Sequence, residues 1–596
     1  MRRTRAACLV ALAIGCLAAL AAATEAPKYE PNWASLDARP LPAWFNEARF
    51  GVFIVWGPYS VPSWAPKGQY AEWYGNHMRN RNSPTWKFHA KTYGENFKYE
   101  EFAPRLTAEM WDPEAWADLF VRSGARYVVL SANYHDGYCL WPSPYAKGWN
   151  AMDVGPKRDL LGDMTDAVRK RGLKMGIYYS LYEWYHPLWL SDRPRYVAEH
   201  FHPQFKDVIT RYRPSIIFAD GEWEGDDKLW RSEELLAWLF SESPAREDIV
   251  VNDRWGGGRG RHGSFYESEY GGGNMSPKHP WQEDRGMGRS YGYNRMESID
   301  EYDSAAEMIR MLTRCAGNGG NYLLCIGPTA DGRIPVIMQE RLLQIGAWLK
   351  ANGDAVYGSQ AGPFWPRKMP WGTCTYKPGR LFLHFWTLPA GPVTLPGLKN
   401  KVTAIYRLAD KDKRPVAQAR QTDAGVTFDR PDLPDFRPEQ DGAAVLVAEI
   451  EGEPSIDMTI RPAADGTITL RAVEADIHGA SPQYESGDGK DNIGFWQNPK
   501  DAVSWRFRVE RPGEFEVQAT YSCAAGAGGS RFDVSVADSK LEGTTRETGE
   551  WNRFAPEVLG RVKLAKAGEF TLTVQPRAEP KWRSMGLQSI VLRPVP

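Results

Sequence analysis

The segment PSIIFADGEWEG, residues 214–225, runs from four apolar residues directly into an acid, a glycine and a second acid. A continuous apolar run is typical of a parallel strand that is buried on both faces. In a barrel of alternating strands and helices, the carboxyl ends of such strands carry the catalytic residues. Asp220 is therefore a candidate catalytic nucleophile. An aspartate after a strand equally often caps a helix or fixes a turn, so this segment alone leaves both interpretations open.

Strands and helices alternate on both sides of this segment, from residue 50 to about residue 355. Apolar runs predict further strands at residues 49–57, 125–132, 174–180, 249–255 and 319–327. Amphipathic segments predict helices at residues 111–124, 160–172, 196–212 and 334–353. Asp112 and Pro113 suit the start of the first helix, and Gly353 suits the end of the last. We therefore expect an α/β fold, a (β/α)8-like barrel over residues 26–357.

A Gly- and Pro-rich section, residues 256–280, interrupts this alternation. It is too long for an ordinary connection between a strand and a helix, and long irregular loops in compact domains are usually functional. We therefore expect this section to serve the site rather than the scaffold.

After Tyr357 the pattern changes to short alternating runs separated by Pro, Gly, Asn and Asp, which is typical of β-sandwiches. The runs RLFLHFW, KVTAIYRLA and GAAVLVAEI predict one β-sandwich over residues 358–453. The runs TITLRAVEADIHG, VSWRFRVERPGEFEVQATYSC, RFDVSVA and GEFTLTVQP predict a second β-sandwich over residues 454–596.

The amino-terminal segment MRRTRAACLVALAIGCLAALAAATEA has a basic start, an apolar stretch and small residues at its end. This pattern indicates a signal peptide over residues 1–25 and export of the mature protein, to the periplasm or outside the cell. Cys16 follows Ala-Ile-Gly, which faintly resembles a lipoprotein cleavage site, but apolar residues continue beyond it. Lipid anchoring is therefore the lesser alternative. No other run is long enough to predict a membrane span.

Composition restricts the partners and cofactors. The formal net charge of −1 gives no basic field for nucleic acid. After the signal segment only Cys139, Cys315, Cys325, Cys374 and Cys523 remain, without a CxxC pair. We expect mostly free cysteines, at most one disulfide, and no metal or other cofactor. The 25 tryptophans and 27 tyrosines suit stacking on sugars, although core packing explains most of them.

Eight segments lie in order at the expected strand ends of the first domain. They are WFNEARFGVFIVWGPYSVPSWAPKGQYAEWYGNHM, GARYVVLSANYHDGYCLWPS, DVGPKRDLLGD, KMGIYYSLYEW, SIIFADGEWE, NDRWG, GRSYGYNR and GGNYLLCIGPTADG. Together they resemble the family 29 glycoside hydrolases, the α-L-fucosidases, over roughly residues 43–358. The resemblance implies a barrel followed by a β-sandwich, and hydrolysis of α-L-fucosides with retention of configuration. Extra sandwiches on secreted glycosidases often bind carbohydrate, so the second sandwich is a candidate for that role.

The resemblance also assigns residues to the site. Asp220 matches the family nucleophile. The positions that match the sugar pocket are Trp56, Glu72, Trp73, Tyr134, His135, one of Tyr178 and Tyr179, and Arg254. Only one of the two tyrosines faces inward on a strand, and we choose Tyr179. Each position also has a purely structural interpretation: Trp56 as a core residue, for example, and Arg254 as a partner of Asp253.

Three departures from the family pattern bear on substrate and mechanism. Val55 and Tyr134 stand where the family usually has histidines, so two polar contacts to the sugar are missing. Gln282 stands where the family has a glutamate, and an amide cannot transfer a proton in that role. We therefore take Glu283 as the acid/base after a one-residue shift in a loop, with Glu269 as the alternative. Glu283 could also be only a solvated surface charge.

Two functions follow from this sequence. The first is an exported, retaining exo-glycosidase that cleaves α-L-fucosides or related L-sugar glycosides by double displacement. The second is a catalytically weak or inactive carbohydrate-binding relative that kept the barrel. Both have a glycan as the partner, and neither fixes the oligomeric state. The carboxylate of Asp220 at a strand end favours the enzyme, because a binding protein does not need a nucleophile there.

Overall fold

The protein is described by a computed structural model over residues 28–273, 275–367, 369–422, 425–479, 482–487, 490–579 and 581–595. The expected signal peptide, including Cys16, lies outside the described residues. Within them, no helix is long and apolar enough to cross a membrane. The five cysteines after the signal segment are all buried and free, which confirms the expectation of mostly free cysteines.

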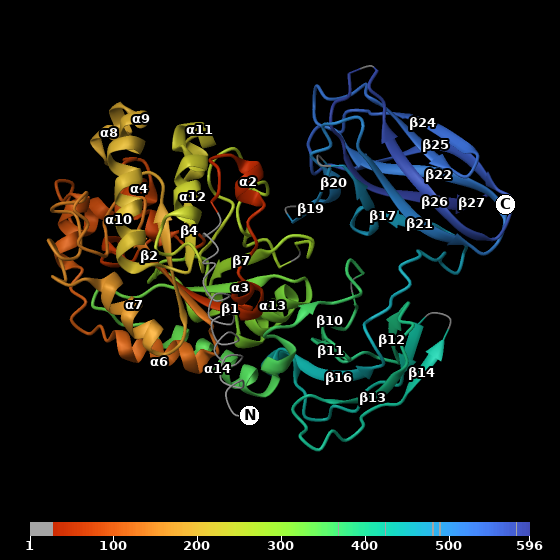
Figure 1. Cartoon of the computed structure of the whole chain (residues 1–596), viewed down its shortest axis with the longest axis horizontal. Coiled ribbons are helices and arrows are strands. Elements are labelled where there is room, and N and C mark those ends of the chain that lie inside the picture. The colour runs from red at the N-terminus through yellow and green to blue at the C-terminus, as the bar shows by residue number, and fades with distance from the viewer. Residues whose placement is uncertain are drawn as a thin grey trace, which may run out of the picture.

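The first domain lies on the left in Figure 1. It is built on a curled sheet of eight parallel strands in the order β5-β4-β3-β2-β1-β8-β7-β6. The strands are β1 (Phe50–Ile54), β2 (Tyr127–Asn133), β3 (Lys174–Ser180), β4 (Ile216–Asp220), β5 (Val250–Val251), β6 (Tyr266–Glu269), β7 (Trp281–Gly286) and β8 (Asn321–Ile326). All residues of β1, β2, β4 and β8 are buried, as expected for parallel strands covered on both faces.

Strands β5 and β6 form the two ends of this sheet and are not paired with each other. The gap between them is bridged by a backbone hydrogen bond of 2.9 Å from Ser264 N to Val251 O. The side-chain amide of Asn252 adds a bond of 2.9 Å to Glu267. The sheet therefore closes to a barrel through loop and side-chain contacts at this one seam.

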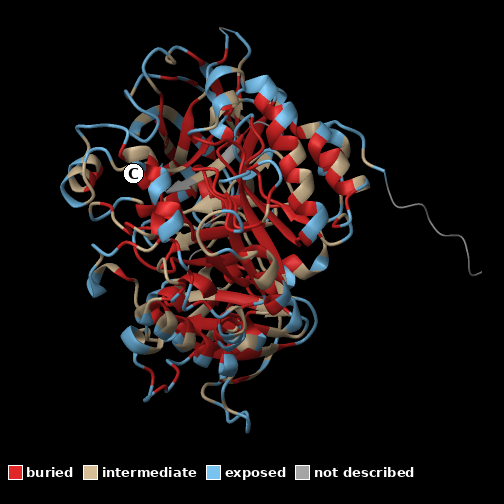
Figure 2. Ribbon diagram, turned by 90° about the vertical axis from the view of Figure 1, so that its left-hand side faces the viewer, coloured by how far each residue is buried: buried red, intermediate tan, exposed pale blue. Residues whose placement is uncertain are grey.

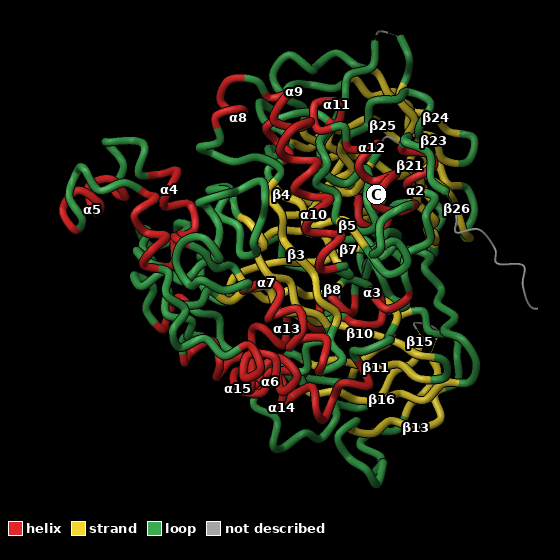
Figure 3. Tube along the Cα trace, turned by 60° about the vertical axis from the view of Figure 1, so that its left-hand side comes forward, coloured by secondary structure: helices red, strands yellow, loops and turns green. Residues whose placement is uncertain are grey.

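Helices cover the outside of the sheet (Figure 3). The longer ones are α6 (Pro113–Ser123), α7 (Leu160–Lys170), α10 (His202–Tyr212), α12 (Ser232–Ser241), α13 (Ala305–Gly317) and α14 (Val336–Asn352). Shorter helices lie in the connecting segments: α2 (Trp33–Asp37), α3 (Ala43–Ala48), α4 (Tyr74–His77), α5 (Pro84–Thr92), α8 (Pro187–Ser191), α9 (Arg193–Tyr196) and α11 (Asp227–Trp230). A further short helix, α15 (Pro438–Asp441), belongs to the second region. As predicted, the Asp112 carboxylate caps α6 by accepting from the backbone N–H groups of Glu114 and Ala115.

The second region is a small β-sandwich that packs against the barrel. One sheet has the order β13-β16-β11-β10-β9 and the other β12-β15-β14. Its strands are β9 (Gln360–Ala361), β10 (Gly372–Lys377), β11 (Arg380–Phe385), β12 (Val393–Pro396), β13 (Val402–Arg407), β14 (Ala419–Thr422), β15 (Gly425–Phe428) and β16 (Ala444–Ile450). Leu383 and Leu446 pack inside the sandwich, whereas Phe382 and Val447 belong to the core of the barrel. Strands β11 and β16 are thus buried on both faces.

The third region is a larger β-sandwich with a hydrophobic core of its own, which runs from Ile468 to Leu592. Its sheets have the orders β19-β20-β27-β22-β25, with β17 paired to β27, and β18-β21-β26-β23-β24. The strands are β17 (Ile468–Arg471), β18 (Asp476–His478), β19 (Gln483–Gly487), β20 (Lys490–Gly494), β21 (Ala502–Val509), β22 (Gly513–Ser522), β23 (Arg531–Val536), β24 (Ser539–Thr544), β25 (Ala555–Leu564), β26 (Gly568–Pro576) and β27 (Gly586–Pro594). Buried residues fill the interior of the barrel and of the first sandwich (Figure 2).

The fold class agrees with the expectation of a barrel followed by sandwiches, but two barrel strands were not predicted. The irregular section from residue 256 to 280 contains β6, and β7 begins directly after it. The sequence of β7, WQEDRG, carries polar and charged side chains on buried positions, so it lacks the apolar signature by which strands are recognised. Both strands supply side chains to the site.

Candidate active site

A cavity of about 260 Å³ lies at the carboxyl ends of the barrel strands. Pockets for drug-sized ligands usually span about 300–1,000 Å³, so this cavity suits a single monosaccharide. Its lining residues are Phe53, Val55, Tyr70, Glu72, Trp73, Tyr134, Tyr178, Phe218, Asp220, Trp223, Arg254, Arg259, Glu269, Asp284 and Tyr291.

Asp220 ends β4 and is held by three neighbours. Its Oδ1 accepts a hydrogen bond of 2.5 Å from Nη1 of Arg254, and its Oδ2 accepts one of 2.6 Å from the hydroxyl of Tyr178. Nε2 of His135 lies 3.3 Å from Oδ2. Burial alone would raise the pKa of Asp220, but the charge of Arg254 and the bonds from His135 and Tyr178 outweigh it and hold the pKa well below its ordinary value. Asp220 is therefore ionised.

Glu269 ends β6 and faces the same cavity. Its Oε2 accepts hydrogen bonds of 2.8 Å from Arg254 and 3.1 Å from Arg259, and its Oε1 accepts one of 3.3 Å from Tyr70. Burial raises the pKa of Glu269 to about 7; Arg254 opposes the rise, and the negative charges of Glu267 and Asp220 add to it. A carboxylic acid that keeps its proton near neutral pH is suited to general acid catalysis.

Arg254 connects these two carboxylates. Its guanidinium is buried and ion-paired with Asp220, Glu267 and Glu269, and it lies 3.9 Å from Glu222. Four acids around one cation cannot all be ionised without large repulsion. Burial raises the pKa of Glu222 to about 8 and also raises the pKa of Glu267. The negative charge of Asp220 adds to both increases.

Asp284, on β7, is a further buried acid of the cavity wall that sequence reasoning missed. The hydroxyl of Tyr291 donates a bond of 2.7 Å to its Oδ2. Burial and the negative charges of Glu267 and Glu269 raise its pKa well above the ordinary value. It lies in register with Glu269 on the neighbouring strand, so both side chains point into the barrel. The sequence could have indicated Asp284 only through this pairing with Glu269, and the pairing becomes visible only when β6 and β7 are both recognised as strands.

Glu283 does not reach the cavity. It pairs in register with Ser268 on the outer face of β6 and β7. Its carboxylate accepts bonds from the Ser268 hydroxyl and from the N–H groups of Gly272 and Gly273. The choice of Glu283 as acid/base is therefore corrected: side chains alternate along a strand, so neighbouring residues of β7 point to opposite faces. Gln282 points inward, but into the barrel core, where it accepts a bond from Tyr127.

Two further choices are corrected for the same reason. Tyr179 points away from the cavity and donates a hydrogen bond to Gln204 of α10, whereas Tyr178 contacts Asp220. Trp56 packs between Trp111 and Trp116 outside the cavity. This agrees with the alternative interpretation of Trp56 as a core residue. In each case the adjacent residue faces inward, Tyr178 in β3 and Val55 after β1.

The remaining expected residues surround the cavity. Glu72 and Trp73, in the 3-10 helix η2 (Ala71–Trp73), together with Tyr134 and Arg254, line it, and His135 contacts Asp220. The Tyr134 ring stacks on that of Tyr178 at 5.4 Å. Glu72 Oε2 accepts bonds from Ser290 and Gly292, whereas its buried Oε1 has no hydrogen-bond partner among the described residues. Burial raises the pKa of Glu72 to about 7.

One group of possible metal ligands occurs among the described residues, Glu183, His186 and His200. His200 Nε2 lies 2.7 Å from Oε1 of Glu183, and Nδ1 of His186 accepts the N–H of Leu188 at the start of α8. Glu183 and His200 therefore form a buried hydrogen-bonded pair, and His186 caps the start of α8 beside it. None of the three residues lines the cavity.

The order of strands, the acids at their carboxyl ends and the one-sugar cavity agree with a match to known sequences. A family model described as alpha-L-fucosidase matches residues 16–354. The chain belongs to the α-L-fucosidase family. Bovine tissue alpha-L-fucosidase is 44% identical over 347 residues, which cover 56% of this chain and 73% of that protein.

Solved structures of fucosidases share this fold. The crystal structure of Thermotoga maritima alpha-fucosidase matches with a TM-score of 0.61 and 35% identity, covering 71% of this chain and all of that one. An alpha-L-fucosidase from Vibrio sp. strain EJY3 covers 93% of this chain with a TM-score of 0.64. Its 21% identity shows likeness of fold alone.

Val55 and Tyr134, the two positions at which the family resemblance predicts histidines, both line the cavity. Phe53 and Phe218 line it as well. Apolar and aromatic side chains therefore make up part of its wall.

Proposed function

We propose that this protein hydrolyses α-L-fucosides with retention of configuration, with Asp220 as the nucleophile and Glu269 as the acid/base. The observation that carries the proposal is the contrast between two carboxylates bound to the same guanidinium. One is held ionised by Arg254, Tyr178 and His135, and the other has its pKa raised to about 7. Two carboxyl groups with separated pKa values suit the two roles of a glycosidase, one as the ionised nucleophile and one as the protonated acid.

In the first step, a carboxylate oxygen of Asp220 attacks the anomeric carbon of the sugar. The bond from that carbon to the leaving oxygen breaks, and the protonated Glu269 delivers its proton to that oxygen. The product is an ester between the sugar and Asp220, together with a free alcohol. Asp220 loses its negative charge when it becomes an ester, and Glu269 gains one when it gives up its proton, so the total charge around the Arg254 guanidinium stays constant.

In the second step, ionised Glu269 takes a proton from a water molecule. The water oxygen attacks the anomeric carbon, and the ester bond to Asp220 breaks. Asp220 leaves as a carboxylate, which Arg254 and Tyr178 stabilise again through their hydrogen bonds. Two inversions at the same carbon retain its configuration.

The expected partner is a fucosylated oligo- or polysaccharide. The cavity of about 260 Å³ has room for about one sugar, which supports removal of a terminal residue rather than cleavage inside a chain. The proposal includes export, which rests on the sequence pattern of residues 1–25. The alternative of a binding protein without activity is not favoured, because the two poised carboxyl groups serve no purpose in binding alone.

The test is hydrolysis of 4-nitrophenyl α-L-fucoside, followed by nitrophenol release and by proton NMR of the first-formed sugar anomer. We expect turnover with an α-configured first product. Asp220→Gly should lower kcat by several orders of magnitude, and added azide should partly restore turnover as a glycosyl azide of inverted configuration. Undiminished turnover by folded Asp220→Gly, or a β-configured first product from the parent, would refute the mechanism.

A further inference from the structure

A second and larger space lies between the barrel and the carboxyl-terminal sandwich. It encloses about 610 Å³. The barrel contributes residues of β6 and of the section from residue 260 to 279, and the sandwich contributes residues from Ala472 to Lys490 around β18, β19 and β20. We call this space the interdomain cleft. The long section of residues 256–280 is thus one of its walls.

The interdomain cleft and the catalytic cavity are neighbours across a single strand. On β6, Glu267 and Glu269 point inward to Arg254, whereas Ser268 points outward to Glu283. Glu269 lines the cavity, and Gly271, two residues further on, lines the cleft. On the preceding loop, Arg259 likewise lines the catalytic cavity, and its neighbour Gly260 lines the interdomain cleft. The path from one space to the other therefore runs over the carboxyl end of β6.

The proposed mechanism fixes the direction in which a substrate must extend. A general acid has to lie within hydrogen-bond reach of the leaving oxygen. Because Glu269 ends β6, the leaving group begins at this strand. The catalytic cavity holds one sugar, so the rest of the glycan must lie outside it. A leaving group of more than one sugar is thereby led across the end of β6 towards the interdomain cleft.

The walls of the interdomain cleft have the chemistry of a sugar site. The ring of Tyr266 is stacked on that of His279 at 3.6 Å, and half-buried Tyr484 and Trp365 add aromatic surface from the other domains. Lys490 is ion-paired with Glu485, and Tyr484 donates a hydrogen bond of 2.6 Å to Asp491. Aromatic rings offer flat apolar faces to sugars, and charged groups offer donors and acceptors to hydroxyls.

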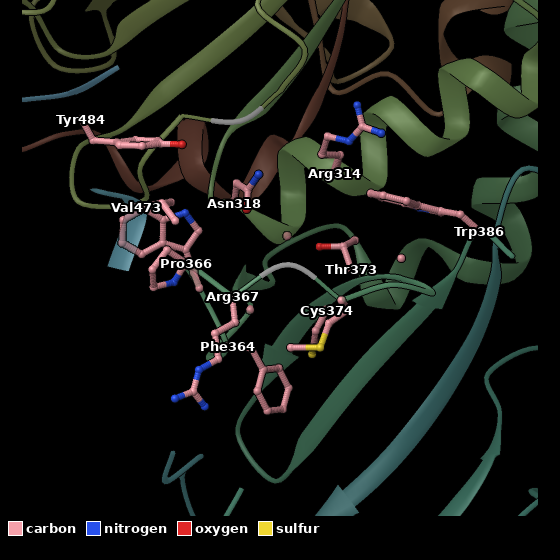
Figure 4. Close-up of a pocket in the computed structure, with 15 residues that line it drawn as sticks. Arg314, Asn318, Phe364, Pro366, Arg367, Thr373, Cys374, Trp386, Val473 and Tyr484 are labelled. Atoms are coloured by element: carbon pink, nitrogen blue, oxygen red, sulfur yellow. The ribbon is translucent and has the colours of Figure 1, made fainter. Parts of the chain in front are cut away.

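Two of these aromatic residues, Trp365 and Tyr484, also line an adjoining cavity of about 360 Å³ at the junction of the three domains (Figure 4). Figure 4 shows Tyr484 and Val473 of the sandwich opposite Asn318 and Arg314 of the barrel. Trp365, Val473 and Tyr484 line both spaces. The carboxyl-terminal sandwich therefore borders a continuous set of spaces beside the active site.

We propose that the interdomain cleft binds the leaving-group sugars of a fucosylated oligosaccharide, so that the carboxyl-terminal sandwich takes part in substrate recognition. This inference rests on the proposed function, because it uses Glu269 as the acid. It predicts that recognition depends on chain length. Sugars directly next to the fucose lie over the end of β6, and only longer leaving groups reach Tyr484 and Lys490.

The experiment compares kcat/KM for 4-nitrophenyl α-L-fucoside with kcat/KM for fucosyl di-, tri- and pentasaccharides that cover several linkages. The variants are Tyr484→Ala and Lys490→Ala. Trp551→Ala is the matched control, because Trp551 is an exposed aromatic residue of the same sandwich outside the cleft. We expect the pentasaccharide-to-aryl ratio to fall about fivefold in Tyr484→Ala, mainly through KM, equivalent to about 1 kcal/mol of lost stacking. The control should keep the parental ratio.

Tyr484→Phe keeps the ring and should keep most of the ratio, which separates stacking from damage to the fold. An unchanged ratio in both cleft variants, or an equal loss for di- and pentasaccharides, would overturn the inference. So would a parent that cleaves the aryl fucoside but none of the oligosaccharides. Among the outcomes of this comparison of substrates, the absence of all fucosidase activity in the parent is the one that would count against the proposed function itself.

A binding measurement decides the inference without turnover. Saturation-transfer NMR with the defucosylated tetrasaccharide should show contact with the parent and with Trp551→Ala, and clearly weaker contact with Tyr484→Ala. Equal signals from the parent and Tyr484→Ala would show that the interdomain cleft holds only solvent.

Discussion

Asp220 and Glu269 bind the same guanidinium, that of Arg254, through opposite nitrogen atoms. The shared cation helps to keep Asp220 ionised, whereas burial and the negative charges of neighbouring acids raise the pKa of Glu269 to about 7. The two groups are therefore coupled, and a change in either one alters the charge that the other experiences.

The first prediction concerns pH. Glu269 must carry its proton to act as an acid, and its pKa is raised to about 7. The kcat/KM for a fucoside should therefore be high below pH 7 and fall above it. The acidic limb should lie far lower, because the pKa of Asp220 is depressed. A pH profile of kcat/KM checks this prediction, and a rate that stays level up to pH 9 would contradict it.

The second prediction separates Glu269 from Glu283. Glu269→Gln should lower kcat/KM by about a hundredfold or more for phenyl fucosides, because general acid catalysis contributes about 10²- to 10⁴-fold, and less for leaving groups that need no proton. Glu283→Gln should keep most of the activity. It should lower the free energy of unfolding by about 1–3 kcal/mol, because the buried carboxylate accepts three hydrogen bonds.

Denaturant unfolding and kinetics with a series of aryl fucosides measure both effects. Loss of the phenyl fucoside activity in folded Glu283→Gln, with Glu269→Gln fully active, would return the acid/base role to Glu283.

The third prediction uses the neighbouring pair Tyr178 and Tyr179. Tyr178→Phe removes a hydrogen bond to the ionised Asp220 and should lower kcat/KM by about tenfold or more, since bonds to charged groups contribute about 1.5–3 kcal/mol. Tyr179→Phe removes only the bond to Gln204. It should lower the free energy of unfolding by about 1 kcal/mol and leave kcat/KM within a factor of two. The reverse order of effects in kinetics would contradict the assignment.

The fourth prediction concerns the altered wall of the cavity. Val55 offers no donor or acceptor, and Tyr134 offers a single hydroxyl. A buried sugar hydroxyl without a partner costs about 1–3 kcal/mol. The double variant Val55→His, Tyr134→His should therefore raise kcat/KM for simple aryl fucoside by about tenfold. A correctly folded double variant with no gain would show that these two positions do not set specificity.

The sequence was sufficient for the general fold and for the place of Asp220 at the end of a barrel strand, because an apolar strand that ends in an acid has a clear signature. It was insufficient where two neighbouring residues compete for the same role, because side chains alternate between the two faces of a strand and only one of the pair faces the cavity. Tyr179 and Trp56 each lie one residue from the side chain that faces the cavity, and the sequence does not state which face is inward.

Glu283 was misplaced for a different reason. The interior of β6 and β7 carries Glu267, Glu269, Gln282 and Asp284, so the usual relation between burial and apolar character is inverted there. The acids are tolerated because Arg254 neutralises part of their charge and raised pKa values neutralise the rest. Only the three-dimensional arrangement reveals this compensation.

The two-faced burial of β11 and β16 has a thermodynamic consequence. Since Phe382 and Val447 complete the barrel core, the smaller sandwich cannot melt without exposing apolar surface of the barrel, and the two should unfold as one cooperative unit. The larger sandwich has its own core and is free to melt in a separate step. Calorimetry of the intact chain should therefore record two heat-absorption peaks, of which the larger contains both the barrel and the smaller sandwich.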